Sequence, residues 1–339
     1  MIKILDDTKV YVWTPAKVAT GGPEALHQLV YNLRNSLGIN AFIFYVNLSN
    51  QIILDPVHEN YKKYNNPYVF EIEDNSKNIL IVPEMFQAIS IVNNFKKIRI
   101  LIWWLSLDNY YIIRFSIELG VSFEEVNRNP YFAIRYYQDV DLTKDEYLKK
   151  AICHMAQSVY VQEHLINKGF SNVVYLSEYL NEDFLNENFN RKDKRDIVLY
   201  NPAKGMEFTS KIINIGHFRY IPISNRNRKQ IIYLLEHAKV YIDFGNFPGK
   251  DRIPREAVIM GCCIITGKKG SAYYFADLPI SDEYKFEDKE ENIPLIADKI
   301  QDCFYNFEKN IENFINFRNI IKQEHQKFIQ DLQCIFNKR

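Results

Sequence analysis

Residues 240–266 read VYIDFGNFPGKDRIPREAVIMGCCIIT, and this pattern indicates how the second half of the chain folds. The apolar run at 240–243 is typical of a buried strand, and the run at 262–266 is typical of another. Between them lie a glycine-bearing basic turn and an amphipathic segment that Pro254 is suited to open, because proline favours the first turn of a helix. A strand, a helix and a strand in this order form one unit of a parallel sheet.

The same alternation of apolar and amphipathic segments extends over most of the chain. In the first half a helix is expected from Pro23, and in the second half a helix through Ile231 and Leu235 that Ser224 is placed to cap. Further strands are predicted at 9–13, 41–46, 79–82, 98–104, 159–161, 173–176, 197–200 and 218–221. The sequence therefore predicts an α/β fold with two Rossmann-like domains facing across a cleft.

A polar, highly charged segment at 181–196 separates the two series of strands and is typical of an interdomain linker. We expect an N-terminal domain over residues 1–180 and a C-terminal domain over residues 197–303. In residues 304–339 apolar side chains recur at three- and four-residue spacing, which predicts a long C-terminal helix packing back on the domains. A helix that binds a partner or a membrane surface is the alternative reading of that segment.

Composition excludes several classes of protein. The 339 residues carry 42 Lys and Arg against 42 Asp and Glu, so there is no electrostatic basis for binding nucleic acid. The five cysteines form no CxxC pair, which argues against a disulfide framework or a zinc ribbon. The first seven residues are charged and unlike a signal peptide, and the most apolar stretch, 98–107, is about half of the ~20 residues that span a bilayer. We expect a soluble cytoplasmic protein.

Four loops that follow predicted strands carry glycines or cations suited to an anion. Backbone N–H groups at a helix N-terminus and positive side chains bind phosphate groups, and Glu256 can accept hydrogen bonds from a sugar or ribose diol. An ordinary turn explains each loop taken alone, and a complement to the helix dipole explains Glu256. Together they predict a diphosphate site at Gly21, Gly22, Lys204, Gly205, Gly249, Lys250, Arg252, Arg255, Glu256, Gly270 and Ser271. Neither G-x-G-x-x-G nor a Walker A sequence occurs.

Three side chains are candidates for a general base that removes a proton from a substrate hydroxyl. Asp108 follows a buried strand and is the first candidate, with a role as helix cap as its alternative. Glu84 follows the preceding strand, and His27 lies one turn beyond the glycine pair. The sequence Asp139-Val140-Asp141 has the spacing of a metal-binding D-x-D motif, although paired acids are also common where a helix begins.

The segment from Tyr241 to Thr266 resembles the donor site of GT-B glycosyltransferases, especially those of glycosyltransferase family 4. In that family a glutamate followed by Ala, a small residue and Gly precedes a buried strand, as Glu256-Ala257 and Gly261 do here. Lys204-Gly205 is similar to the Lys-Gly pair of the family, and Gly21-Gly22 is similar to its N-domain glycine loop. Two features of the family are missing, since Pro248 stands where the first glutamate of its E-x7-E pattern falls and no arginine precedes Lys204.

The resemblance implies a sugar transferase in which the C-terminal domain holds a nucleotide-sugar donor. The acceptor would be a glycan or a lipid-linked saccharide, in bacterial surface polysaccharide synthesis, with peripheral association at the inner face of the membrane. Such enzymes bind the diphosphate with basic groups and helix dipoles, so no cofactor and no essential metal are expected. Two alternatives remain, a non-catalytic sugar- or nucleotide-binding scaffold and a sugar-nucleotide epimerase or phosphorylase of the same fold.

Overall fold

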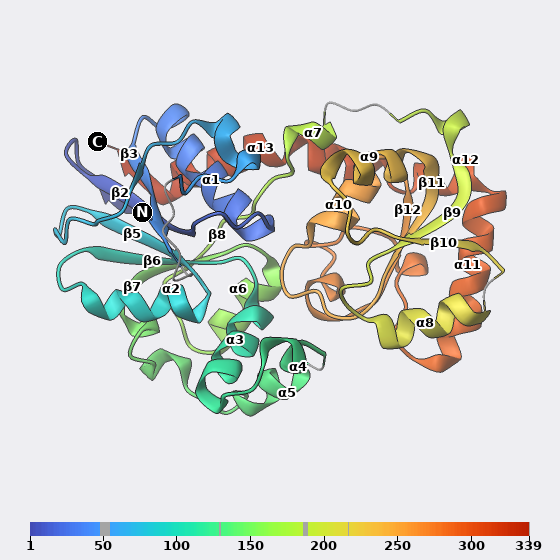
Figure 1. Cartoon of the computed structure of the whole chain (residues 1–339), viewed down its shortest axis with the longest axis horizontal. Coiled ribbons are helices and arrows are strands. Elements are labelled where there is room, and N and C mark those ends of the chain that lie inside the picture. The colour runs from blue at the N-terminus through green and yellow to red at the C-terminus, as the bar shows by residue number, and fades with distance from the viewer. Residues whose placement is uncertain (48–54, 129, 186–188, 216, 339) are drawn as a thin grey trace. The chain divides into compact units, whose positions relative to one another are not determined.

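The computed structural model describes residues 1–47, 55–128, 130–185, 189–215 and 217–338. The chain divides into two compact units (Figure 1). Unit 1 combines Met1–Glu178 with Gln326–Arg339, and unit 2 is Tyr179–His325. Residues 181–196, where we expect the linker, belong to unit 2 and include α7 (Glu182–Leu185) and the 3-10 helix η5 (Arg191–Asp193).

Unit 1 is built on a seven-stranded sheet in which all strands are parallel, in the order β4-β3-β2-β5-β6-β7-β8. The chain runs outward from β2 to β4 and then returns to add β5 on the other side of β2. Its strands are β2 (Lys9–Pro15), β3 (Asn40–Val46), β4 (Tyr68–Val69), β5 (Ile79–Pro83), β6 (Arg99–Trp104), β7 (Ala151–Ala156) and β8 (Val173–Tyr175).

Helices cover both faces of this sheet, because parallel strands need crossover connections and these are right-handed. Figure 1 shows α1 on one face and α2 and α3 on the other. The helices are α1 (Gly21–Asn35), α2 (Phe86–Ser90), α3 (Leu107–Leu119), α4 (Phe123–Arg128), α5 (Tyr131–Tyr136) and α6 (Val159–Asn167). The central strands are consequently buried and almost wholly apolar, as Val10, Val12, Ile81 and Ile102 illustrate.

Unit 2 repeats the principle with four parallel strands in the order β10-β9-β11-β12. The strands are β9 (Arg195–Tyr200), β10 (Arg219–Pro222), β11 (Ala238–Asp243) and β12 (Cys263–Thr266). The helices are α8 (Met206–Ile215), α9 (Arg228–His237), α10 (Arg252–Ile259), α11 (Ile293–Tyr305) and α12 (Phe307–Glu312). The confirmed fold class is therefore α/β with two Rossmann-like units.

A buried lysine lies at the end of the second sheet where strand β9 begins. The ammonium group of Lys194 donates hydrogen bonds to the carbonyls of Leu235 and Met260 at 2.7 Å and of Ala238 at 3.0 Å. Ala238 and Met260 are the C-caps of α9 and α10. The cation thus meets the negative ends of two helix dipoles, which offsets the cost of its burial.

The C-terminal part of the chain contains the expected long helix, α13 (Ile315–Ile335), followed by a short strand that we did not predict. This strand, β13 (Phe336–Lys338), pairs in parallel with β1 (Ile2–Ile4). The division between the units falls within α13, after His325. Phe317 and Ile321 are buried in the core of unit 2, and Phe328 and Leu332 are buried in unit 1.

Most predicted strands are confirmed, and two local predictions are wrong. Residues 159–161 begin helix α6 rather than forming a strand, because the hydroxyl of Ser158 accepts a hydrogen bond from the N–H of Val161 and caps the helix. Helix α9 is capped by Asn227, not by Ser224. Asn227 and Gln230 form a reciprocal capping box, which satisfies two backbone donors at once.

Candidate functional site

Each sheet has one place where the strand order reverses, and open α/β sheets bind ligands at the carboxyl ends of the strands there. In unit 2 the reversal lies between β9 and β11, and in unit 1 between β2 and β5. The loops that carry the predicted site residues follow these strands and their neighbours β6 and β12. The topology therefore places the candidate residues of each unit at the edge where a ligand is expected.

Two glycines meet at the reversal point of unit 2. Gly205 follows β9 and Gly245 follows β11, and both have positive φ, +61° and +94°. A Cβ atom on Gly205 would lie 2.1 Å from the carbonyl oxygen of Phe244, and one on Gly245 would lie 2.6 Å from the Cα of Gly205. Only glycine fits at either position. The backbone is therefore free of side chains at these two positions, beyond the carboxyl ends of β9 and β11.

The loops after β11 and β12 are joined by further close contacts. A Cβ on Gly270 would lie 2.1 Å from the carbonyl oxygen of Phe247, and the N–H of Ser271 donates to that oxygen at 2.9 Å. The hydroxyl of Ser271 donates to the carbonyl of Gly249 at 2.5 Å. The structure thus brings together Gly205, Gly249, Gly270 and Ser271, which the sequence placed in three separate loops.

Lys204 occupies the centre of these loops. Its ammonium group lies 3.3 Å from the carboxylate of Asp243, pairs with Asp251, and sits 3.5 Å from the centre of the Phe247 ring. Burial by itself lowers the pKa of Lys204, but the carboxylates of Asp243 and Asp251 outweigh it and hold that pKa above its ordinary value. Tyr241 donates a hydrogen bond to Asp243 at 2.7 Å. Lys204 therefore stays charged.

The remaining basic residues of the third loop divide into two groups. Lys250 and Arg255 are buried, and both pair with Glu324 at 2.9 Å. Arg255 also donates to the backbone carbonyls of Asp251 and Lys250, at 3.2 and 3.1 Å. These contacts brace the loop. Arg252 and Glu256, by contrast, are half-buried in the first turns of α10.

In unit 1 the glycine pair lies at the N-terminus of α1, which begins at Gly21 rather than at Pro23. A Cβ on Gly22 would lie 3.8 Å from the side chain of Leu105, in the loop after β6. Glu84, in the loop after β5, accepts a hydrogen bond from the N–H of Leu105 at 2.8 Å. Burial raises the pKa of Glu84 to about 7, although the backbone N–H bonds oppose this. Glu84 and the glycine pair therefore share one neighbour.

Asp108 lies in the first turn of α3, two residues beyond the N-cap position, which Ser106 occupies. Asp108 is 1% exposed, and its carboxylate accepts a hydrogen bond from the hydroxyl of Tyr160 at 2.8 Å. Glu84 is also buried, in the loop after the neighbouring strand β5.

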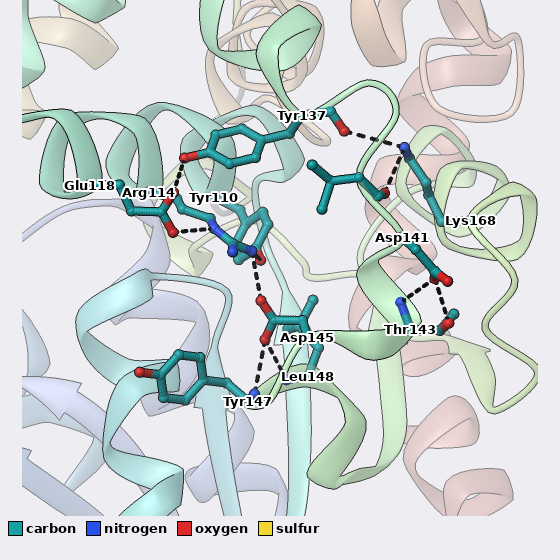
Figure 2. Close-up of polar contacts among 11 residues, drawn as sticks. Tyr110, Arg114, Glu118, Tyr137, Asp141, Thr143, Asp145, Tyr147, Leu148 and Lys168 are labelled. Carbon is teal, nitrogen blue, oxygen red and sulfur yellow. Dashed lines mark hydrogen bonds and ion pairs between the residues drawn. The ribbon is translucent and has the colours of Figure 1, made fainter.

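Helix α3 is fixed in place by a network around Arg114 (Figure 2). The guanidinium group donates to Glu118 at 2.8 Å, and to Tyr110 and Asp145 at 2.7 Å. Tyr137 donates to the other oxygen of Glu118 at 2.6 Å. Because every charge in this network has a partner, we assign it to holding the helix that carries Asp108 rather than to binding a ligand.

Two other candidates have structural partners. The ring of His27 bonds the carbonyl of Pro23 and the hydroxyl of Tyr45, each at 2.7 Å, so Nδ1 donates and Nε2 accepts. Burial lowers the pKa of His27 to about 4, which keeps the ring neutral. Asp141 caps the 3-10 helix η3 (Leu142–Lys144) by accepting the N–H of Thr143 (Figure 2). Among the described residues no group of three or more acids, histidines and cysteines is arranged to hold a metal ion.

No family model matches the sequence, and no curated protein matches it. Solved structures do. Anabaena HepE in complex with UDP-glucose has a TM-score of 0.62 at 12% identity, covering 96% of this chain and 99% of its own. Sucrose-phosphate synthase from Thermosynechococcus elongatus has a TM-score of 0.65 at 11% identity, covering 97% and 98%. The lipopolysaccharide outer core galactosyltransferase WaaB, in its apo form, has a TM-score of 0.58 at 11% identity, covering 95% and 99%.

The chain has the GT-B fold. The GT-B resemblance found in the sequence is thereby confirmed for the fold. The site residues that the sequence indicates stay predictions. Within the described part of the chain, every helix is too short or too polar to span a bilayer.

Sequence reasoning missed three acids that pair with the predicted site residues. Asp243 and Asp251 hold Lys204, and Glu324 holds Lys250 and Arg255. Asp243 had a local signal, since it is a charged residue that ends a buried strand. Glu324 lies 69 residues beyond Arg255 in α13, and no local pattern connects the two.

Proposed function

We propose that this protein is a glycosyltransferase that moves a sugar from a nucleotide-diphosphate donor to a glycan or lipid-linked acceptor. The observation that carries the proposal is the contact between Gly205 and Gly245 beside Lys204, at the reversal point of the second sheet. Bare backbone next to the N-terminus of α10 is suited to a diphosphate. The similarity to HepE, which was solved with UDP-glucose, supports the same ligand class.

In this proposal unit 2 holds the donor and unit 1 the acceptor. Glu256 accepts hydrogen bonds from the ribose or sugar hydroxyls, and the N-terminal groups of α10 face the phosphates. If the reaction inverts the sugar, Asp108 is the first choice for the base and Glu84 the second, the latter with a pKa near neutrality. We propose no cofactor and no essential metal. The similarity to WaaB supports a setting in surface polysaccharide synthesis, which would place the protein in the cytoplasm near the membrane.

The proposal is tested first with a ligand panel of UDP, GDP, dTDP, ADP, CMP and their sugar conjugates. A ligand at ~100 times its Kd should stabilise the protein by about 2.7 kcal/mol in a thermal-shift assay. We expect one nucleotide and its sugar conjugates to bind. Transfer of the sugar or hydrolysis of the donor would then exclude a non-catalytic scaffold, the alternative suggested by Pro248 in place of the first glutamate of the family. Interconversion of the sugar without an acceptor would favour an epimerase. A panel in which nothing binds contradicts the proposal.

The role of Glu256 is tested with Glu256→Gln. A lost charge-assisted hydrogen bond to the ribose should weaken donor binding by about ten-fold or more, measured by calorimetry. Glu236→Gln is the matched control, because Glu236 is also a half-buried glutamate of a helix in unit 2. Equal donor affinities for the two variants would remove Glu256 from the site.

A further inference from the structure

A second pocket lies in unit 2 on the turn that follows the predicted donor loop. It measures about 470 Å³, within the ~300–1,000 Å³ typical of small-ligand sites. Two lysines, two aromatic rings and two polar residues contribute to its lining, namely Lys268, Lys285, Tyr273, Phe275, Ser281 and Asp282. Its wall begins within the 3-10 helix η6 (Gly270–Tyr273), which also contains Gly270 and Ser271. The pocket and two of the predicted donor residues therefore share one 3-10 helix.

Lys285 is the unusual member of this lining. The residue is 5% exposed, and its ammonium group donates to the carbonyl of Ala272 at 2.9 Å. That carbonyl is its one hydrogen-bond partner among the described residues, although an ammonium group has three donors. The backbone fixes its position, since Lys285 bridges to Thr266 at the end of β12 and the N–H of Phe286 donates to the carbonyl of Thr266.

The charges around Lys285 do not neutralise it. Burial lowers the pKa of Lys285 to about 8, with Asp282 and Asp277 opposing that change and Lys268 adding to it. The side chain of Asp282 is 89% exposed and lies 4.0 Å from Lys268. At neutral pH the pocket thus contains a buried cation with unused hydrogen-bond donors, which is costly unless an anion completes its coordination.

The aromatic side of the pocket indicates what carries that anion. Tyr273 and Phe275 are 71% and 68% exposed, so their rings leave large apolar faces uncovered. The C–H-bearing face of a pyranose ring is apolar and stacks on such a surface, while its hydroxyls bond polar groups such as Ser281. A sugar with an acidic substituent satisfies both the rings and the lysine.

We propose that this pocket receives the sugar of the donor and that Lys285 pairs with a carboxylate on it, so that the preferred donor is a nucleotide-linked uronic acid. The inference rests on the proposed function and deepens it. The anion that Lys285 meets has two sources in such a donor, the sugar carboxylate and the diphosphate. These differ in which ligands they affect, because every donor has the diphosphate and only the uronic acid has the carboxylate.

The test measures the binding of UDP, UDP-glucose and UDP-glucuronic acid to the full chain by calorimetry. We expect the wild type to bind UDP-glucuronic acid at least about ten-fold more tightly than UDP-glucose, as a charge-assisted bond to a buried cation predicts. Lys285→Met should abolish this preference and leave the affinity for UDP unchanged. Lys211→Met is the control, because Lys211 is a surface lysine of the same unit that pairs with Glu290.

Three results would overturn the proposal, and they are distinguishable. Equal wild-type affinities for the two UDP-sugars would exclude the carboxylate, and this comparison depends on no variant. A loss of UDP affinity in Lys285→Met would assign Lys285 to the diphosphate, provided that the variant keeps the wild-type circular dichroism. Failure of all three UDP compounds to bind would overturn the UDP donor together with the uronic acid, whereas UDP binding without preference would leave the proposed function intact.

Discussion

Glu84 is 4% exposed, and burial raises the pKa of its carboxyl group to about 7. In the unfolded chain the same group has the ordinary value of about 4.5. Between these two pH values the folded state holds a proton that the unfolded state has released. The contribution of Glu84 to the free energy of unfolding therefore falls as the pH rises from about 4.5 to 7.

We predict that Glu84→Gln removes this loss. At 1.36 kcal/mol per pKa unit the variant should be more stable than the wild type by up to about 3 kcal/mol above pH 7, and about equally stable near pH 4. Urea denaturation at pH 4, 6 and 8 measures the difference. Exposed Glu73 is the control, because the hydrogen bond from Lys9 lowers the pKa of Glu73, so Glu73→Gln should lose stability relative to the wild type as the pH rises. A pH-independent gap for Glu84→Gln would contradict the burial argument.

Single residues also show where the sequence is informative. Gly205, Gly270 and Ser271 were predicted from local glycine patterns, and they lie together because the topology brings the ends of parallel strands to one edge. Lys285 gave no signal, because it stands in a polar run and its burial depends on a bridge to Thr266. Its environment becomes apparent only when the segment is packed beside β12.

At the scale of the loops, the crossing of Gly205 and Gly245 yields a prediction with a matched control. Gly205 and Gly120 have nearly the same φ, +61° and +66°, but a Cβ on Gly120 meets nothing within 4 Å. Gly120→Ala should cost about 1–2 kcal/mol of stability from the left-handed conformation alone. Gly205→Ala adds a steric clash with the backbone at Phe244, so it should cost more and abolish nucleotide binding.

Denaturation and calorimetry of the two variants provide the measurement. Unchanged nucleotide affinity in Gly205→Ala would show that the loop crossing is not part of the donor site. A larger loss of stability in Gly120→Ala than in Gly205→Ala would contradict the steric argument itself.

Elements differed in how far they could be predicted. The strongly apolar runs of β2, β3, β5 and β6 were found because a strand buried on both faces has no polar positions. β7 (Ala151–Ala156) was missed because His154 interrupts its apolar run, whereas residues 159–161 form the first turn of α6, in which Val161 is buried. A run of three apolar residues is compatible with either a strand or a helix. Here the residues form a helix, because Ser158 caps its N-terminus.

For the whole molecule, the fold class followed from the order of the elements, while the contribution of α13 to both units did not. Its apolar spacing predicts a buried helix, but which core each turn enters depends on contacts far away in the sequence. Phe328 is 2% exposed, and its ring centre lies 6.1 Å from that of Trp103 in β6. The end of the chain is thus part of the core of unit 1.

We predict that Phe328→Ala destabilises the protein by about 3–5 kcal/mol, as expected for an aromatic residue removed from a core. Lys327→Ala, on the exposed side of the same helix, should change stability by less than about 0.5 kcal/mol. Should the two units unfold separately, the loss should appear in the transition of unit 1. A loss confined to unit 2, or equal effects of the two variants, would contradict the assignment of this turn.

The division within α13 has a consequence for the order of events on the ribosome. Unit 2 is a continuous segment, so it is complete once residue 325 has left the exit tunnel. The segment that closes unit 1 is translated after unit 2, although most of unit 1 is translated before unit 2. The nascent sheet around Trp103 must therefore wait, with its hydrophobic surface uncovered, until Phe328, Leu332 and β13 arrive. Premature termination of translation shortly after residue 325 would release a polypeptide in which unit 2 is complete and unit 1 lacks its C-terminal segment.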